Sequence, residues 1–177
     1  MKAAVLGGAG YAGGELLRLL HGHPQIKSVI ATSRSQAGKK LGEVHPQLAA
    51  LTDATFLGLT PVEAAQKAEV VFLALEHGES GKVVPELLNL GPKMIIDIAA
   101  DFRTSDRALY EKYYGKHPNP ELLGKFTYAL ADVLGQSLKV VEPGAATRQP
   151  KRIPMAPMPV PVASRSPGQL HSRLSLA

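Results

Sequence analysis

The residues whose type and spacing point most directly to chemistry are glycines near the amino terminus. Gly7, Gly10 and Gly13 are spaced three apart, and Gly8 offers a second register, Gly8-x-Gly10-x-x-Gly13. They follow a short apolar segment and precede a leucine-rich one, as where a strand passes through a glycine loop into a helix. Such a loop offers unpaired backbone N–H groups and a positive helix end to a pyrophosphate. The pattern predicts a dinucleotide site; the plainer alternative is a strand, turn and helix without a ligand.

A group of polar residues begins twenty residues beyond Gly13. The chain reads Ser33-Arg34-Ser35 there, whereas a fold that prefers NAD usually has Asp or Glu near this place to bind the ribose 2′-hydroxyl. A carboxylate would repel a 2′-phosphate, while hydroxyl groups and a forked guanidinium bind one. Ser33, Arg34 and Ser35 therefore favour NADP. The alternative is that Arg34 is a solvated loop residue.

Two candidate substrate residues follow later apolar segments of the chain. His77, in Glu76-His77-Gly78, could face the nicotinamide or the substrate, or it could be a capping or solvated residue. Arg103, in Asp101-Phe102-Arg103, could bind a substrate phosphate or carboxylate. Its alternative role is an ion pair with Asp101 that shapes the turn.

The elements that must position these residues alternate between strands and helices. Besides the first strand and helix, the hydrophobic pattern predicts strands at 27–32, 69–75 and 93–98 and helices at 61–67, 80–90 and 106–114. The segment 33–61 reads as loops with one short strand near 55–57. This order predicts an α/β fold, a doubly wound Rossmann-like parallel sheet, with its ligand at the carboxyl ends of the strands.

The composition excludes several classes of function. The net charge is +5, but residues 140–177 hold five basic residues and one acid, so the remainder is nearly neutral and nucleic acid is not an expected partner. No apolar run approaches the roughly 20 residues of a membrane span, and no signal peptide is recognisable, so we expect a cytoplasmic protein. The histidines show no spacing typical of a metal site, so no metal is expected.

The chain changes character near residue 140. Seven of its 14 prolines lie in 140–177, and proline lacks the N–H that a helix or ladder needs. We therefore expect a Rossmann domain at 1–139 and a disordered, basic, proline-rich tail at 140–177. The alternative for the tail is a ligand for a partner's groove.

These motifs in combination resemble the N-acetyl-gamma-glutamyl-phosphate reductases, and equally the related reductases of aminoadipyl phosphate bound to an amino-group carrier protein. The resemblance covers residues 1 to about 139 and rests on the segments 7–16, 32–34, 37–39, 44–46, 72–78, 100–103 and 113–118. It implies an NADPH-dependent reduction of an acyl phosphate to a semialdehyde in arginine or lysine biosynthesis. The implied substrate is a small acyl phosphate or one bound to a carrier protein, and the family implies a homo-oligomer.

The resemblance also implies roles for individual residues. Gly10, Tyr11, Ala12 and Gly13 would hold the pyrophosphate, with Gly7 in the same loop. Ser33, Arg34 and Ser35 would bind the adenosine ribose phosphate, and Arg103 would lie toward the substrate phosphate.

One departure from the family is severe. The family uses a cysteine thiolate, placed soon after the position of Lys139, to attack the acyl phosphate, and this chain contains no cysteine. We therefore expect a cofactor domain that is truncated or frameshifted after about residue 139, lacks the substrate domain and is inactive alone. The alternative function is a non-catalytic NADP-binding regulatory or interaction module.

Overall fold

A computed structural model describes residues 1–128, and the predicted tail at 140–177 lies outside the described residues. A parallel sheet of four strands, in the order β2-β1-β3-β4, forms the centre of the described part. The strands are β1 Lys2–Leu6, β2 Ser28–Thr32, β3 Val70–Leu73 and β4 Met94–Asp97. The chain thus crosses over β1 on its way from β2 to β3, and the predicted doubly wound Rossmann-like fold is confirmed.

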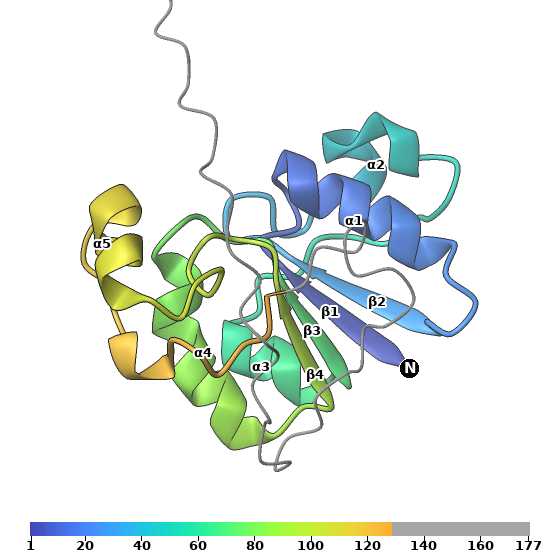
Figure 1. Ribbon diagram of the computed structural model, residues 1–177. Coiled ribbons are helices and arrows are strands. Elements are labelled where there is room, and N and C mark those ends of the chain that lie inside the picture. The colour runs from blue at the N-terminus through green and yellow to red at the C-terminus, as the bar shows by residue number, and fades with distance from the viewer. Residues whose placement is uncertain (129–177) are drawn as a thin grey trace, which may run out of the picture. The chain divides into compact units, whose positions relative to one another are not determined.

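Helices cover both faces of this sheet (Figure 1). The alternation of side chains along β1 decides which face receives which residue: Ala3 and Val5 face one way, Ala4 and Leu6 the other. Ala3 and Val5 pack with α1 Tyr11–His21, α2 Leu41–Val44 and the 3-10 turn η1 Pro46–Leu48. Ala4 and Leu6 pack with α3 Pro61–Gln66 and α4 Glu79–Leu90. α5 Arg107–Tyr114 and the 3-10 turn η2 Pro120–Leu122 follow β4.

Local signals place the ends of the helices. Thr60 caps α3 through a reciprocal pair of hydrogen bonds with Glu63, and Pro61 occupies the first helical position, as predicted. Gly91, at φ +62°, ends α4. Asp106 lies just outside α5, because its side chain accepts the N–H of Leu109 and so caps the helix.

The segment 33–61 differs from the prediction. It contains α2 and η1, which were expected as loop, and the expected short strand near 55–57 is reduced to isolated bridges. α2 and η1 are too short to show a hydrophobic period in the sequence. They are held by the burial of Leu41 and Leu48, both 0% exposed, against the sheet. Within residues 1–128 no helix is long and apolar enough to cross a membrane.

Candidate functional site

The glycine loop between β1 and α1 is shaped by two close backbone approaches. Gly7 has φ +80°, and a Cβ there would lie 2.4 Å from the carbonyl oxygen of Ala74, just beyond β3. A Cβ at Gly13 would lie 2.7 Å from the carbonyl oxygen of Gly7. Neither position has room for a side chain. Gly7 is therefore required for the loop to pack closely against β3, and Gly13 is required for α1 to pack closely against the loop.

Gly10 differs from these two glycines because the space beside it is open. A Cβ there would find only the carbonyl oxygen of Gly7, 3.8 Å away. Gly10 is the N-cap of α1 and makes no side-chain cap, and the first turn contains no acidic residue. The N–H groups of the first turn, which begins with the exposed Tyr11 and Ala12, have no partner within a helix. This arrangement leaves a positive helix end free for an anion.

The loop that follows β2 lies beside the glycine loop. The N–H of Gly8 donates to the carbonyl oxygen of Thr32 at 3.0 Å, so the two loops leave neighbouring strands at the same edge of the sheet. Ser33 Oγ accepts the N–H of Gln36 at 3.2 Å, with Ser35 Oγ 3.5 Å away. Arg34 is exposed and, within residues 1–128, forms no ion pair. The structure therefore brings Ser33, Arg34 and Ser35 to the loop that carries Gly7, Gly10 and Gly13.

The glycine loop is supported by a buried histidine whose contact with the loop was not predicted. His45 lies where α2 ends, and its Nε2–H donates to the carbonyl oxygen of Gly8 at 2.9 Å. A Cβ at Gly14 would stand 2.6 Å from the Nδ1 and Cε1 atoms of this ring. His-Pro in a loop is an ordinary sequence, so nothing indicated this contact before the fold was known.

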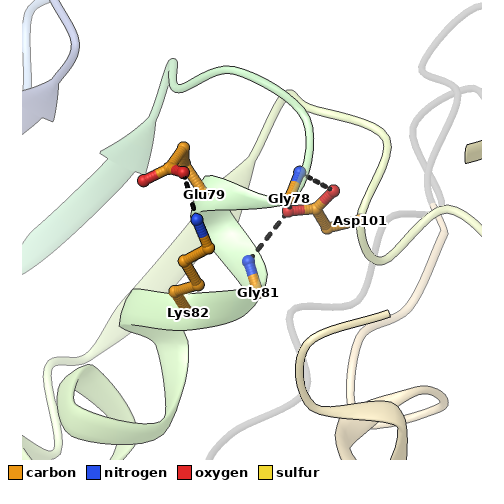
Figure 2. Close-up of polar contacts among 5 residues, drawn as sticks. All are labelled: Gly78, Glu79, Gly81, Lys82 and Asp101. Carbon is orange, nitrogen blue, oxygen red and sulfur yellow. Dashed lines mark hydrogen bonds and ion pairs between the residues drawn. The ribbon is translucent and has the colours of Figure 1, made fainter. Parts of the chain in front are cut away.

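The positive end of α4 is occupied by a side chain of the chain itself. The buried Asp101 carboxylate accepts the N–H of Gly78 at 2.8 and 3.0 Å and that of Gly81 at 2.8 Å, as Figure 2 shows. The hydroxyl of Tyr110 donates to the same carboxylate at 3.0 Å. Burial, together with this hydrogen bond to Asp101, raises the pKa of Tyr110. The end of α4 is therefore neutralised internally, in contrast to the end of α1.

The loop after α5 supplies a hydrogen bond that the first turn of α4 lacks. Pro85 lies inside α4 and has no N–H for the carbonyl oxygen of Gly81, four residues earlier. Asn119 Nδ2 donates to that oxygen instead, at 2.8 Å. His117 is buried beside it, where Nε2–H donates to the carbonyl oxygen of Asp101 at 3.1 Å and Nδ1 accepts the N–H of Asn119 at 3.0 Å. His117 is thus a structural residue of this loop.

Arg103 does not pair with Asp101. Its Nε donates to the carbonyl oxygen of Ala99 at 2.9 Å and its Nη2 to that of Ile98 at 3.1 Å. Within the described part of the chain no carboxylate forms an ion pair with it. The alternative role, an ion pair between Arg103 and Asp101 that shapes the turn, is therefore wrong. The Arg103 guanidinium is exposed, and Asp101 does not compensate its charge.

His77 lies at the other side of the same turn. Its Nδ1 accepts the N–H of Ala100 at 3.3 Å, so a neutral ring carries its proton on Nε2. The ring packs against Tyr114, with 5.5 Å between the ring centroids. His77 is exposed, and with Arg103 it borders the loop that leaves β4.

A second carboxylate at this edge was missed from the sequence. Asp97 ends β4, and its Oδ1 accepts the hydroxyl of Ser80 at 2.8 Å and the N–H of Ala99 at 3.1 Å. Its Oδ2 is buried and has no hydrogen-bond partner among residues 1–128. Burial raises the pKa of Asp97, against the lowering effect of the two hydrogen bonds. The sequence signal that could have identified Asp97 is its position directly after the apolar run 94–96, at the carboxyl end of a strand.

Metal ligation has no arrangement to support it within residues 1–128. No group of three or more His, Asp or Glu side chains there lies close enough together to hold a metal ion. The chemistry available at this edge of the sheet is therefore anion binding by backbone N–H groups and by the guanidinium groups of Arg34 and Arg103.

Comparison with known proteins agrees with this geometry. Residues 2–141 match the family described as semialdehyde dehydrogenase, NAD binding domain. The chain is 42% identical over 146 residues to an N-acetyl-gamma-glutamyl-phosphate reductase of Rubrobacter xylanophilus, covering 81% of this chain and 42% of the relative. It is 46% identical over 142 residues to a putative LysW-L-2-aminoadipate/LysW-L-glutamate phosphate reductase of Pyrococcus abyssi, covering 80% and 41%. The chain thus spans about two fifths of the length of these relatives.

A solved structure is also similar. An aspartate semialdehyde dehydrogenase with NADP from Candida albicans is 26% identical, with a TM-score of 0.46 over 58% of this chain and 30% of that chain. The family match covers most of the chain and includes the glycine loop and all four strands of the sheet. A nicotinamide dinucleotide is the ligand that such a loop, at the crossover between β1 and β3, is built to hold. By this match, and by the geometry of that loop, the chain belongs to the semialdehyde dehydrogenase family and carries its NAD-binding domain.

Proposed function

We propose that this chain binds NADP(H) at the carboxyl edge of β1, β2 and β3, as the cofactor domain of an acyl-phosphate reductase of arginine or lysine biosynthesis. The observation that carries the proposal is the open space at Gly10, beside an uncapped helix end, in a loop that neighbours the one carrying Arg34. The names of the relatives, which are phosphate reductases, support the reaction class.

The phosphate groups of the cofactor have matching groups in the chain. Gly10 and the N–H groups of residues 11–13 would hold the pyrophosphate, and Gly7 gives the loop the shape that exposes them. Ser33, Arg34 and Ser35 would bind the 2′-phosphate of the adenosine ribose, since two hydroxyls flank a guanidinium there and no carboxylate repels the anion. When bound, the nicotinamide supplies the hydride for the reduction.

The substrate would lie over the turn that leaves β4. Arg103 is fixed by two carbonyl oxygens, so its remaining N–H groups can bind the phosphate of an acyl phosphate, free or attached to a carrier protein. His77 Nε2–H would donate to the substrate or to the carboxamide of the nicotinamide from the neighbouring loop.

The thiol required for a covalent acyl intermediate is missing from the 177 residues. We therefore expect cofactor binding without turnover by this chain alone. A non-catalytic NADP-binding module is the second candidate, and the same lack of a thiol favours it. The two candidates predict different results when the part of the relatives that lies outside the match is added to this chain: only a cofactor domain of a reductase would then support activity.

A titration of the full chain with NADPH, followed by nicotinamide fluorescence, tests the proposal. Gly10→Ala adds a methyl group that the protein accommodates, with φ −76° and a nearest neighbour at 3.8 Å, but the methyl group takes the place of the pyrophosphate. We expect it to weaken NADPH binding by about tenfold or more, the equivalent of 1.4 kcal/mol.

Gly22→Ala is the matched control. Gly22 lies at the opposite end of α1, with φ −93° and the same 3.8 Å to its nearest neighbour. It should leave both the circular dichroism and the NADPH affinity unchanged. NADPH binding that is absent, or that is unaffected by Gly10→Ala, would contradict the proposed site. Turnover of an acyl phosphate by this chain would contradict the role given to the missing thiol.

A further inference from the structure

Both backbone polar groups of Gly8 are bound by partners from distant segments of the chain. Its N–H donates to the carbonyl oxygen of Thr32 at 3.0 Å, and its carbonyl oxygen accepts Nε2–H of His45 at 2.9 Å. Gly8 is buried, so water has little access to either group. The hydrogen bond from His45 therefore fixes the direction in which the peptide unit between Gly8 and Ala9 faces.

The His45 ring is itself held firmly in place. The N–H of His45 donates to the carbonyl oxygen of Leu41 at 2.8 Å, and its carbonyl oxygen accepts the N–H of Leu48 at 2.8 Å. Both leucines are buried in the core. The ring lies directly against Gly14 and contacts Phe56, with 6.0 Å between the ring centroids. A donor that is fixed before the ligand arrives loses little conformational freedom on binding.

The same peptide unit carries a free donor on its other side. In a trans peptide the carbonyl oxygen and the following N–H lie in one plane and point in opposite directions. Because the Gly8 carbonyl oxygen points toward the His45 ring, the N–H of Ala9 points away from it. Ala9 is partly exposed, and its N–H forms no hydrogen bond within residues 1–128. The first turn of α1, with the N–H groups of Tyr11 and Ala12, begins two residues later.

We infer that His45 is a positioning residue for the pyrophosphate of the cofactor, an inference that rests on the NADP(H) site proposed above. His45 keeps the Gly8 carbonyl oxygen, which would repel an anion, turned into the protein. It thereby directs the N–H of Ala9 to the side where the N–H groups of Tyr11 and Ala12 are free. The hydrogen bond also polarises the peptide unit, which makes the N–H of Ala9 a stronger donor to an anion.

Two substitutions separate the hydrogen bond of His45 from the space that its ring fills. His45→Gln keeps an N–H donor at about the reach of Nε2, whereas His45→Leu fills the space with an apolar side chain. We expect His45→Leu to weaken NADPH and NADH binding by the same factor, about tenfold or more, because both nucleotides contain the pyrophosphate. His45→Gln should bind each nucleotide within about threefold of the unmodified chain. Fluorescence titration measures the affinities, and circular dichroism verifies that each variant is folded.

His21→Leu is the matched control. His21 Nδ1–H donates to the carbonyl oxygen of Leu17 at 2.8 Å, so this substitution removes the same kind of hydrogen bond at the opposite end of α1. It should leave both affinities unchanged. Equal losses of affinity in His45→Gln and His45→Leu would overturn the inference, because the shape of the ring and not its donor would then be what matters. Unchanged affinity in His45→Leu would overturn it as well.

An NMR titration of the unmodified, ¹⁵N-labelled chain with NADPH is independent of how the variants fold. An amide proton that binds an oxyanion moves downfield, and we expect this shift at Ala9 together with Tyr11 and Ala12. If Tyr11 and Ala12 shift and Ala9 does not, the inference about His45 is wrong while the proposed NADP(H) site stands. If NADPH shifts none of the three amide protons, the proposed site itself is wrong.

Discussion

The imidazole of His45 lies so close to Gly14 that a methyl group at residue 14 would stand 2.6 Å from two ring atoms. The same ring holds the carbonyl oxygen of Gly8 through a hydrogen bond of 2.9 Å. The start of α1 and the glycine loop are therefore fixed against each other by one side chain, which lies just after α2. This contact makes the shape of the loop depend on a residue that lies more than 30 positions later in the chain.

A double-mutant cycle between these two residues should show strong coupling. Gly14→Ala overpacks the site and is expected to lower the free energy of unfolding by about 1–3 kcal/mol. His45→Ala alone leaves the Gly8 carbonyl without its partner, which costs about 1–3 kcal/mol. The double variant should lose less than the sum of the two, because the methyl group at residue 14 enters space that the ring has left. Urea denaturation of all four proteins measures this, with additive losses as the contrary result.

The preference between NADPH and NADH should depend on Arg34. A hydrogen bond to a charged group contributes about 1.5–3 kcal/mol, so Arg34→Ala should weaken NADPH binding by about tenfold or more and leave NADH binding unchanged. Arg107→Ala is the control, because Arg107 is an exposed arginine of α5 paired with Glu111. Fluorescence titration with both nucleotides provides the measurement. An equal loss for both nucleotides would place Arg34 elsewhere than on the 2′-phosphate.

Asp101→Asn should destabilise the fold strongly. The amide retains one acceptor oxygen but turns an NH2 group toward an N–H of Gly78 or Gly81, where two donors then face each other. The expected loss is about 2 kcal/mol or more in the free energy of unfolding, as for a buried group left unpaired. Glu79→Gln is a matched change in the first turn of α4, the turn that Asp101 caps, where Glu79 forms an exposed pair with Lys82 (Figure 2). It should cost less than about 0.5 kcal/mol. Similar losses in the two variants would contradict the role given to Asp101.

Asp97 should make the protein less stable as the pH rises toward neutrality. Burial raises its pKa in the folded protein above the ordinary value of 3.8, so the folded state binds the proton more tightly than the unfolded chain does. The resulting stabilisation is complete below the unfolded pKa and is lost as the pH rises through the folded one. Asp97→Asn cannot ionise and keeps the acceptor for Ser80. Its free energy of unfolding, relative to the unmodified chain, should therefore increase between pH 4 and pH 7. If the difference in free energy of unfolding between the two proteins does not vary with pH, ionisation of Asp97 does not destabilise the folded state.

The parts of the fold that are regular could be predicted from the sequence. The strands of the sheet are short continuous apolar runs between turn residues, and the Thr60-Pro61 cap of α3 is a local signal. The glycine loop was recognisable because its three glycines have the spacing of a dinucleotide-binding turn. In the structure, close backbone contacts leave no room for a Cβ at two of them, Gly7 and Gly13.

The rest of the site depends on contacts between distant parts of the chain. The supporting role of His45 requires α2 to lie over Gly14, 31 residues earlier, and no short-range pattern encodes that. The ion pair considered for Asp101 and Arg103 was reasonable for neighbours in sequence, but the N–H groups of α4 bind the carboxylate and two carbonyl oxygens bind the guanidinium. The roles of Ser33, Arg34, Ser35, His77 and Arg103 toward ligands remain predictions.

The fit of Gly7 against Ala74 has a consequence for the newly made polypeptide. The glycine loop is synthesised before β3, yet its conformation is set by the carbonyl oxygen of Ala74, 67 positions after Gly7. Pairing of β1 with β3 is equally non-local, so it must await that stretch of synthesis and is slow to form. We therefore expect a nascent chain that still lacks β3 and Ala74 to contain the glycines but to have no nucleotide affinity. Ligand binding by stalled ribosome complexes of increasing length would therefore begin abruptly once β3 and Ala74 have emerged from the exit tunnel.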